Sequence, residues 1–296
     1  MEMKEFAQKV LVAVKGKLGE GYRVEVKEVR KNNGILLHGL VILSETKNVV
    51  PTIYLEIFLA AYEDGVPFSK IIDKILDVYQ EEMPKGNVSM EFFKEFDKVC
   101  DRICYRLIRR KGNEALLEEI PHVEFMDLAI CFFYSYQGGA LGDGSIPVYN
   151  THLEMWKVGT KELMTLAGVN TPRIYPADFR SMTDILKETG QIQAIGGPVP
   201  ESNLYILTND KRAQGAACIL YPGMLEKIAA ARKKSFYIIP SSVHEVLILR
   251  DTGMENVEEI KKTIREVNSR FVSKEEILSD NLYYYDFVSK TVKIIF

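Results

Sequence analysis

His244 and Glu245 form the only adjacent His-Glu pair in the chain, and Ser241 and Ser242 lie just before them. An imidazole close to two hydroxyl groups offers the groups of nucleophilic catalysis, with His244 as general base and Ser241 or Ser242 as the attacking group. The same four side chains can instead satisfy the backbone of a tight loop. The loop interpretation is favoured, because the sequence contains no recognisable nucleophile elbow or oxyanion loop.

A catalytic interpretation of His244 needs a third group from elsewhere in the chain. A carboxylate that orients the imidazole would complete the set, and the candidates are Asp251, Asp280 and Asp286. Glu245 is a poor direct partner, because adjacent residues of a strand point to opposite faces. The pair also does not begin a His-Glu-x-x-His zinc motif, because Ile248 stands where the second histidine would be.

No cofactor and no metal ion is predicted. Cys100 and Cys104 are four residues apart, but no second Cys or His pair at a zinc-ligand spacing accompanies them. The glycine-rich stretch 138–144 lacks the Gly-Lys-Ser/Thr ending of a phosphate-binding loop, and a strand rather than a helix is expected after it. Buried thiols and a hairpin loop are the simpler interpretations.

The four polar residues lie between two apolar runs, 236–239 and 246–249. Both runs are short and rich in β-branched and aromatic residues, which predicts the two strands of a hairpin. Neither run alternates apolar with polar residues. We therefore expect central strands with both faces covered and the polar set at their exposed tip.

Helical and strand patterns alternate irregularly along the rest of the chain and predict an α+β fold of mixed, largely antiparallel sheets with packed helices. Among the local predictions are a hairpin through the Asn-Gly at 33–34 and a helix capped by Ser69. A strand at 216–220 is expected to pair with one at 204–207. Asn256 with Glu259, and Ser273 with Glu276, form capping-box patterns for two further helices.

A short polar stretch near Gly112 is the expected boundary between two closely associated subdomains. The first, 1–112, is expected to be an N-terminal α/β subdomain. The second, 113–296, is expected to be an α+β subdomain built around the 236–249 hairpin.

Charge and hydropathy limit the partners of the chain. Its 38 basic and 41 acidic residues give a net charge of −3 without a long basic run, which argues against nucleic acid. The N-terminus lacks a signal-peptide pattern, and the longest apolar runs are too short to span a bilayer. A cytoplasmic protein that does not associate with membranes is expected.

Several sequence blocks together resemble the bacterial family catalogued as domain of unknown function 5688. The hairpin block and the closing block are the most specific, and the blocks are PTIYLEIFLAAYEDG (51–65), IPHVEFMDLAICFFY (120–134), YNTHLEMW (149–156), FYIIPSSVHEVLIL (236–249) and VNSRFVSKEEILSDNLYYYD (267–286). The resemblance implies one full-length fold in a cytoplasmic protein of anaerobic, gut-type bacteria. It carries no established activity and no catalytic residues.

The sequence therefore favours a non-enzymatic binding or interaction protein, whose partner is a protein or a small molecule. The alternative is a hydrolase that uses His244 as general base with Ser241 or Ser242. A third possibility is an oligomer in which the closing strands, 283–286 and 291–296, extend the sheet of a neighbouring copy. The sequence does not indicate an oligomeric state.

Overall fold

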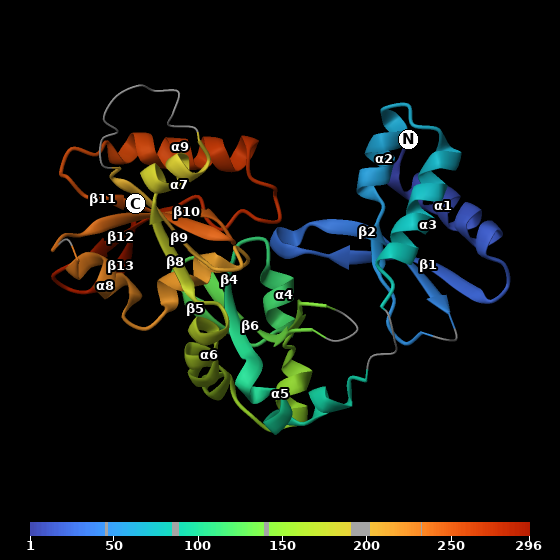
Figure 1. The fold of residues 1–296 in the computed structure, drawn as a ribbon, viewed down its shortest axis with the longest axis horizontal. Helices are drawn as coiled ribbons and strands as arrows, with labels where there is room; N and C mark the ends of the chain where they lie inside the picture. Colours follow the sequence, from blue (N-terminus) through green and yellow to red (C-terminus); the bar gives the residue numbers. More distant parts are fainter. Residues whose placement is uncertain (45–46, 85–88, 139–141, 191–201, 232) are drawn as a thin grey trace. The chain divides into compact units, whose positions relative to one another are not determined.

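The computed structural model of the chain describes residues 1–44, 47–84, 89–138, 142–190, 202–231 and 233–296. The chain divides into two compact units (Figure 1). Unit 1 comprises Met1–Glu91 with Gln137–Gly144, and unit 2 comprises Phe92–Tyr136 with Ser145–Phe296. Gly112, the expected boundary, lies within unit 2. Part of the glycine-rich stretch, 139–141, falls outside the described residues.

Unit 1 packs three helices against a small antiparallel sheet of strand order β1-β2-β3. The apolar side chains of α1 that recur every three to four residues, Phe6, Val10 and Val14, are fully buried. Its elements in chain order are α1 (Met3–Leu18), β1 (Tyr22–Arg30), the 3₁₀ turn η1 (Asn32–Gly34), β2 (Leu36–Ser44), β3 (Thr52–Tyr54), α2 (Glu56–Glu63) and α3 (Phe68–Glu81). The 3₁₀ turn η2 (Glu91–Lys94) begins at the last residue of the unit's first segment and continues into unit 2.

The predicted Asn-Gly hairpin of unit 1 is confirmed. β1 and β2 pair antiparallel from Tyr22 opposite Ser44 to Arg30 opposite Leu36, and Asn33 in the turn has φ +59°. Asparagine tolerates this left-handed conformation better than most residues. The predicted cap of α3 is wrong: the helix begins at Phe68 after Pro67, without a side-chain cap, so Ser69 lies inside its first turn.

Unit 2 contains two larger sheets with their helices. The elements that precede the six-stranded sheet in the chain are η3 (Phe96–Lys98), η4 (Cys100–Arg102), β4 (Ile103–Arg109), α4 (Glu114–Glu119), β5 (His122–Phe125), β6 (Leu128–Tyr136), β7 (Gly144–Pro147), α5 (Asn150–Trp156) and α6 (Thr160–Ile174). Those that follow are β8 (Ala177–Ser181), α7 (Met182–Glu188), β9 (Leu204–Asn209), η7 (Gly215–Leu220), α8 (Met224–Ala230), β10 (Phe236–Ser242), β11 (Glu245–Arg250), α9 (Val257–Arg270), β12 (Leu282–Asp286) and β13 (Thr291–Ile295).

The larger sheet of unit 2 has the strand order β13-β12-β10-β11-β9-β8, and adjacent strands run antiparallel throughout. The predicted hairpin therefore exists, and its strands β10 and β11 are the central pair. β10 continues past Pro240 to Ser242, with a register shift between Ile239 and Ser242. A bulge tolerates proline, because one ladder hydrogen bond is already missing there. The sheets confirm the α+β fold class.

The expected strand at 216–220 is the 3₁₀ helix η7 instead. β9 already has strand partners on both sides, β11 and β8, so no edge remains for a further strand. Cys218 Sγ instead donates to the carbonyl oxygen of Thr208 at 3.0 Å, which holds η7 against the end of β9. The tertiary context here overrides the local strand preference.

No helix in the described part of the chain is long and apolar enough to cross a lipid bilayer.

Candidate functional site

The β10–β11 turn places His244 against two groups that the sequence did not suggest. Its Nδ1 accepts a hydrogen bond from the backbone N–H of Gln214 at 3.3 Å, and its Nε2 lies 3.4 Å from Glu276 Oε1. The imidazole side chain is 35% exposed, so it is neither sealed in the core nor free. Because Nδ1 accepts, the ring proton belongs on Nε2, from which it points to the Glu276 carboxylate.

The two serines do not meet this imidazole. Ser242 Oγ accepts the backbone N–H of His244 at 3.1 Å, while Ser241 Oγ lies 3.5 Å from Glu245 Oε1. Among the described residues no hydrogen bond joins the His244 ring to either serine. With its one lone pair already used by Gln214, the neutral ring has none left to accept a hydroxyl proton. These contacts hold the β10–β11 turn in place and do not form a nucleophile–base pair.

The three aspartates considered as orienting groups lie elsewhere. Asp251 accepts the Tyr284 hydroxyl at 2.7 Å, and Asp280 pairs with Arg109 at 2.7 Å. Asp286 accepts the backbone N–H groups of Val288 and Ser289 in the β12–β13 turn, and these hydrogen bonds keep its pKa below the ordinary value.

The carboxylate beside His244 is Glu276, which the sequence suggested only as part of a helix cap. That cap prediction is wrong, because no helix starts at Ser273. The carbonyl oxygen of Glu276 instead accepts the backbone N–H of Val243 at 2.9 Å. The segment around Glu276 forms turns because it packs on the β10–β11 turn. This is a long-range contact, which a local sequence motif cannot predict.

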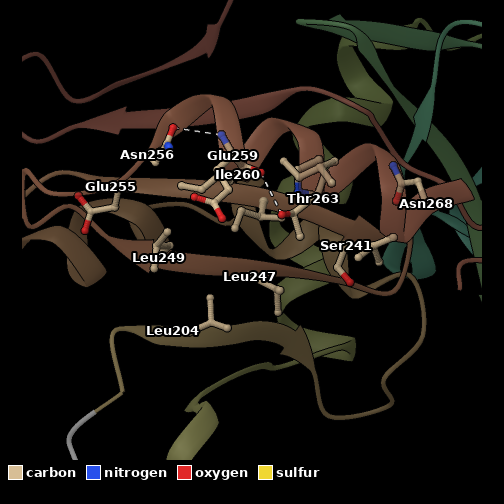
Figure 2. A pocket seen from close by; sticks show the side chains of 14 residues that line it. Leu204, Ser241, Leu247, Leu249, Glu255, Asn256, Glu259, Ile260, Thr263 and Asn268 are labelled. Carbon is tan, nitrogen blue, oxygen red and sulfur yellow. Dashed lines mark hydrogen bonds between the residues drawn. The ribbon is translucent and has the colours of Figure 1, made fainter. Parts of the chain in front are cut away.

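A separate feature of unit 2 is a groove of about 510 Å³ beside α9, the helix on one face of the central sheet (Figure 2). It is called the α9 groove below. Its floor consists of Leu204, Ile239, Leu247 and Leu249, and its helical wall consists of Ile260, Thr263, Ile264 and Val267.

The floor side chains share one face of the sheet. Ile239 pairs with Leu247 across β10 and β11, and Leu249 pairs with Leu204 across β11 and β9. Each of the four is only partly buried. α9 packs against β10 and β12 and does not extend over β11 and β9 to the same degree. In the part of the chain that the structure describes, this face of the hairpin is covered less completely than expected, because its four floor side chains remain partly exposed.

Polar residues lie at the two ends of the α9 groove. Glu255, Asn256 and Glu259 stand at the N-terminal end of α9, and Ser241 and Asn268 stand at the other end (Figure 2). Asn256 caps the helix by accepting the backbone N–H of Glu259 at 3.2 Å, which confirms the predicted cap. An amphipathic lining with polar ends is typical of small-molecule sites.

Glu255 is held in place by the loop before α9. Its carboxylate accepts the backbone N–H groups of Thr252, Gly253 and Met254 at 3.0–3.2 Å, and the Thr252 hydroxyl at 2.6 Å. Burial alone would raise the pKa of Glu255, but these hydrogen bonds outweigh it and lower the pKa below its ordinary value. The group is a fixed negative charge at neutral pH.

The buried cysteines and the possible metal ligands do not form a reactive site. Burial raises the pKa of the Cys104, Cys131 and Cys218 thiols to about 12, so these thiols are protonated at neutral pH. Within the residues that the structure describes, no three His, Cys, Asp or Glu side chains cluster as metal ligands would.

The comparisons with known proteins give one match. The sequence model of a family of unknown function, DUF5688, matches residues 3–287, which confirms the resemblance seen in the sequence. No curated protein and no solved structure matches the chain.

Proposed function

The chain belongs to the DUF5688 family of unknown function, and we propose that it is a non-enzymatic binding protein whose α9 groove takes a small apolar molecule. The observation that supports this most is the floor of the groove. Leucine and isoleucine side chains of central strands are normally buried, yet Ile239, Leu247 and Leu249 remain partly exposed along the apolar floor of the α9 groove.

The size of the groove suits this role. Pockets that hold small molecules measure about 300–1,000 Å³ and are lined mainly by apolar side chains with a few polar groups. The α9 groove, at about 510 Å³, lies within this range. Transfer of apolar ligand surface from water onto the groove floor would supply the binding free energy, at roughly 25 cal/mol per Å² buried.

The test is titration with a neutral apolar fluorophore, N-phenyl-1-naphthylamine, against two matched variants. Thr263→Trp places an indole at a position that lines the groove, whereas Lys262→Trp places it on the preceding residue, whose side chain is 71% exposed and outside the lining. We expect Thr263→Trp to weaken binding about tenfold or more, which is about 1.4 kcal/mol. Lys262→Trp should bind as the parent does. Equal affinities in both variants would contradict the proposal.

The alternative, a hydrolase with His244 as general base, receives less support because both ring nitrogens are engaged by Gln214 and Glu276. A panel of ester and amide substrates tests it directly. Turnover by the parent that is lost in His244→Ala, yet retained in Thr263→Trp, would replace the binding proposal.

A further inference from the structure

We propose that the ligand of the α9 groove is a cationic amphiphile, an apolar chain or ring system that ends in a positively charged nitrogen held by Glu255 and Glu259. This inference rests on the proposed binding function and names the chemical class of the ligand. It follows from the charges around the groove, where the described lining residues include two carboxylates and no Lys, Arg or His side chain.

The nearest cations along α9 are engaged elsewhere. Lys261 pairs with Glu258 at 2.8 Å, and Lys262 lies 3.7 Å from Glu266. None of these four residues lines the groove. An anionic head group, such as that of a fatty acid, would therefore meet two carboxylates and no counter-charge from the described residues at this end.

The two carboxylates differ in a way that suits a cation. Glu255 is fixed by its four donors in the 252–254 loop, so it offers a preorganised charge. The carboxylate of Glu259 is exposed, and in the described part of the chain it has no hydrogen-bond or ion-pair partner. A bound cation would give this unpaired carboxylate a partner.

The positive end of the α9 dipole is too weak to neutralise the carboxylates of both Glu255 and Glu259. The helix dipole places roughly half a positive charge there. Three carboxylates, Glu255, Glu258 and Glu259, stand at this end, and among the described contacts only Glu258 pairs with a lysine. The local charge therefore stays negative after the dipole and the lysine are counted.

The test uses three ligands with the same ten-carbon chain: decyltrimethylammonium, 1-decanol and decanoate. Each is titrated by calorimetry into the full chain at low salt, below the micelle concentrations of the two charged ligands and below the solubility limit of 1-decanol. We expect the cation to bind roughly tenfold more tightly than the alcohol, and decanoate to bind most weakly. Added salt should reduce the advantage of the cation, because the head group stays near solvent.

Two variants separate local recognition from overall charge. Glu259→Gln removes a charge that lines the groove, and Glu258→Gln removes the same charge from the neighbouring residue outside it. The cation should lose about fivefold in affinity in Glu259→Gln, with little change in Glu258→Gln and none for decanol in either variant. Equal losses in both variants would overturn the assigned site.

The outcomes also distinguish this inference from the proposed function. If decanol binds and Thr263→Trp blocks it, but decyltrimethylammonium binds no better, the inference fails and the binding function stands. If none of the three ligands binds and the neutral fluorophore does not respond to Thr263→Trp, both fail.

Discussion

The two faces of the central sheet of unit 2 are built from alternate residues of the same strands, yet they are packed differently. On one face, Ile238, Val246 and Ile248 are at most 2% exposed. On the other face their chain neighbours Ile239 and Leu247 remain partly exposed. Both sets are aliphatic, so composition does not explain the difference.

The cover of each face explains it. η7 contacts β9 and β11, and Ile228 of α8 lies with Phe236 and Ile248 around a space too small for a ligand. Among the described helices, α9 packs on β10 and β12 at the opposite face, and α7 contacts mainly β8 and β9 at the end of the sheet. Six strands at a spacing of about 4.8 Å span roughly 24 Å, whereas a helix is about 10 Å wide. One face is thus a core, and the other keeps a groove.

The largest effect should come from truncating the two faces separately. Ile248→Ala leaves a cavity in the sealed face and should lower the free energy of unfolding by about 2–5 kcal/mol. Leu247→Ala removes a side chain already in partial contact with solvent and should cost less than half as much. Urea denaturation of both variants measures the difference. Equal costs would mean that the groove face is packed as tightly as the core face.

The tightness of the η7 cover can be tested at Gly215. A Cβ there would lie 2.5 Å from the carbonyl oxygen of His244 and 2.8 Å from the backbone nitrogen of Asn209, with the Thr208 hydroxyl closer still. We expect Gly215→Ala to destabilise unit 2 by about 1–3 kcal/mol.

The matched control is Gly168→Ala, because Gly168 lies inside α6 and a methyl group added there would meet no heavy atom within 4 Å beyond its own helix backbone. Alanine there should stabilise the chain by about 0.5–1 kcal/mol. Thermal unfolding of both variants gives the comparison. If Gly215→Ala left the stability unchanged, η7 would be able to move away from the sheet at little cost in free energy.

The turn that joins the two central strands should contribute less than either face. His244→Gln weakens the contacts of the ring with Gln214 and Glu276 and should cost about 1 kcal/mol, since water can reach a side chain that is 35% exposed. Ser241→Ala, whose 3.5 Å contact with Glu245 is at the limit of a hydrogen bond, should cost less than about 0.5 kcal/mol. If either variant lost more free energy of unfolding than Ile248→Ala, the turn would contribute more to stability than the sealed face does.

A further small effect concerns pH and the rim of the groove. The pKa of Glu255 is below its ordinary value of 4.5 in the folded chain, so the unfolded chain binds more protons in acid. Glu255 thus contributes stability above pH 4.5 that is lost as the pH falls through the lowered pKa. Because solvent reaches the group, the contribution should stay below about 1 kcal/mol.

Unfolding curves of the parent and of Glu255→Gln at neutral and acidic pH test this sign. The variant should be less stable than the parent at neutral pH, and the gap should narrow in acid. A gap that widens as the pH falls would contradict the assignment of Glu255 as a hydrogen-bonded carboxylate.

The elements that the sequence predicted correctly depend on neighbouring residues. The Asn-Gly turn between β1 and β2, the β10–β11 hairpin and the Asn256 cap of α9 each follow from side chains a few positions apart. The errors have the opposite origin. η7 replaced a strand because both edges of β9 were taken, and the helix expected at Ser273 gave way to the docking of Glu276 on the turn.

By itself the sequence determined the α+β class, the family and which residues are apolar along β10, β11 and α9. Only the tertiary structure decided which of those apolar residues are sealed, which carboxylate meets His244 and where the groove lies. The physical reason is that periodicity reports the chemistry of a face, whereas burial depends on the width and position of the element that packs against it.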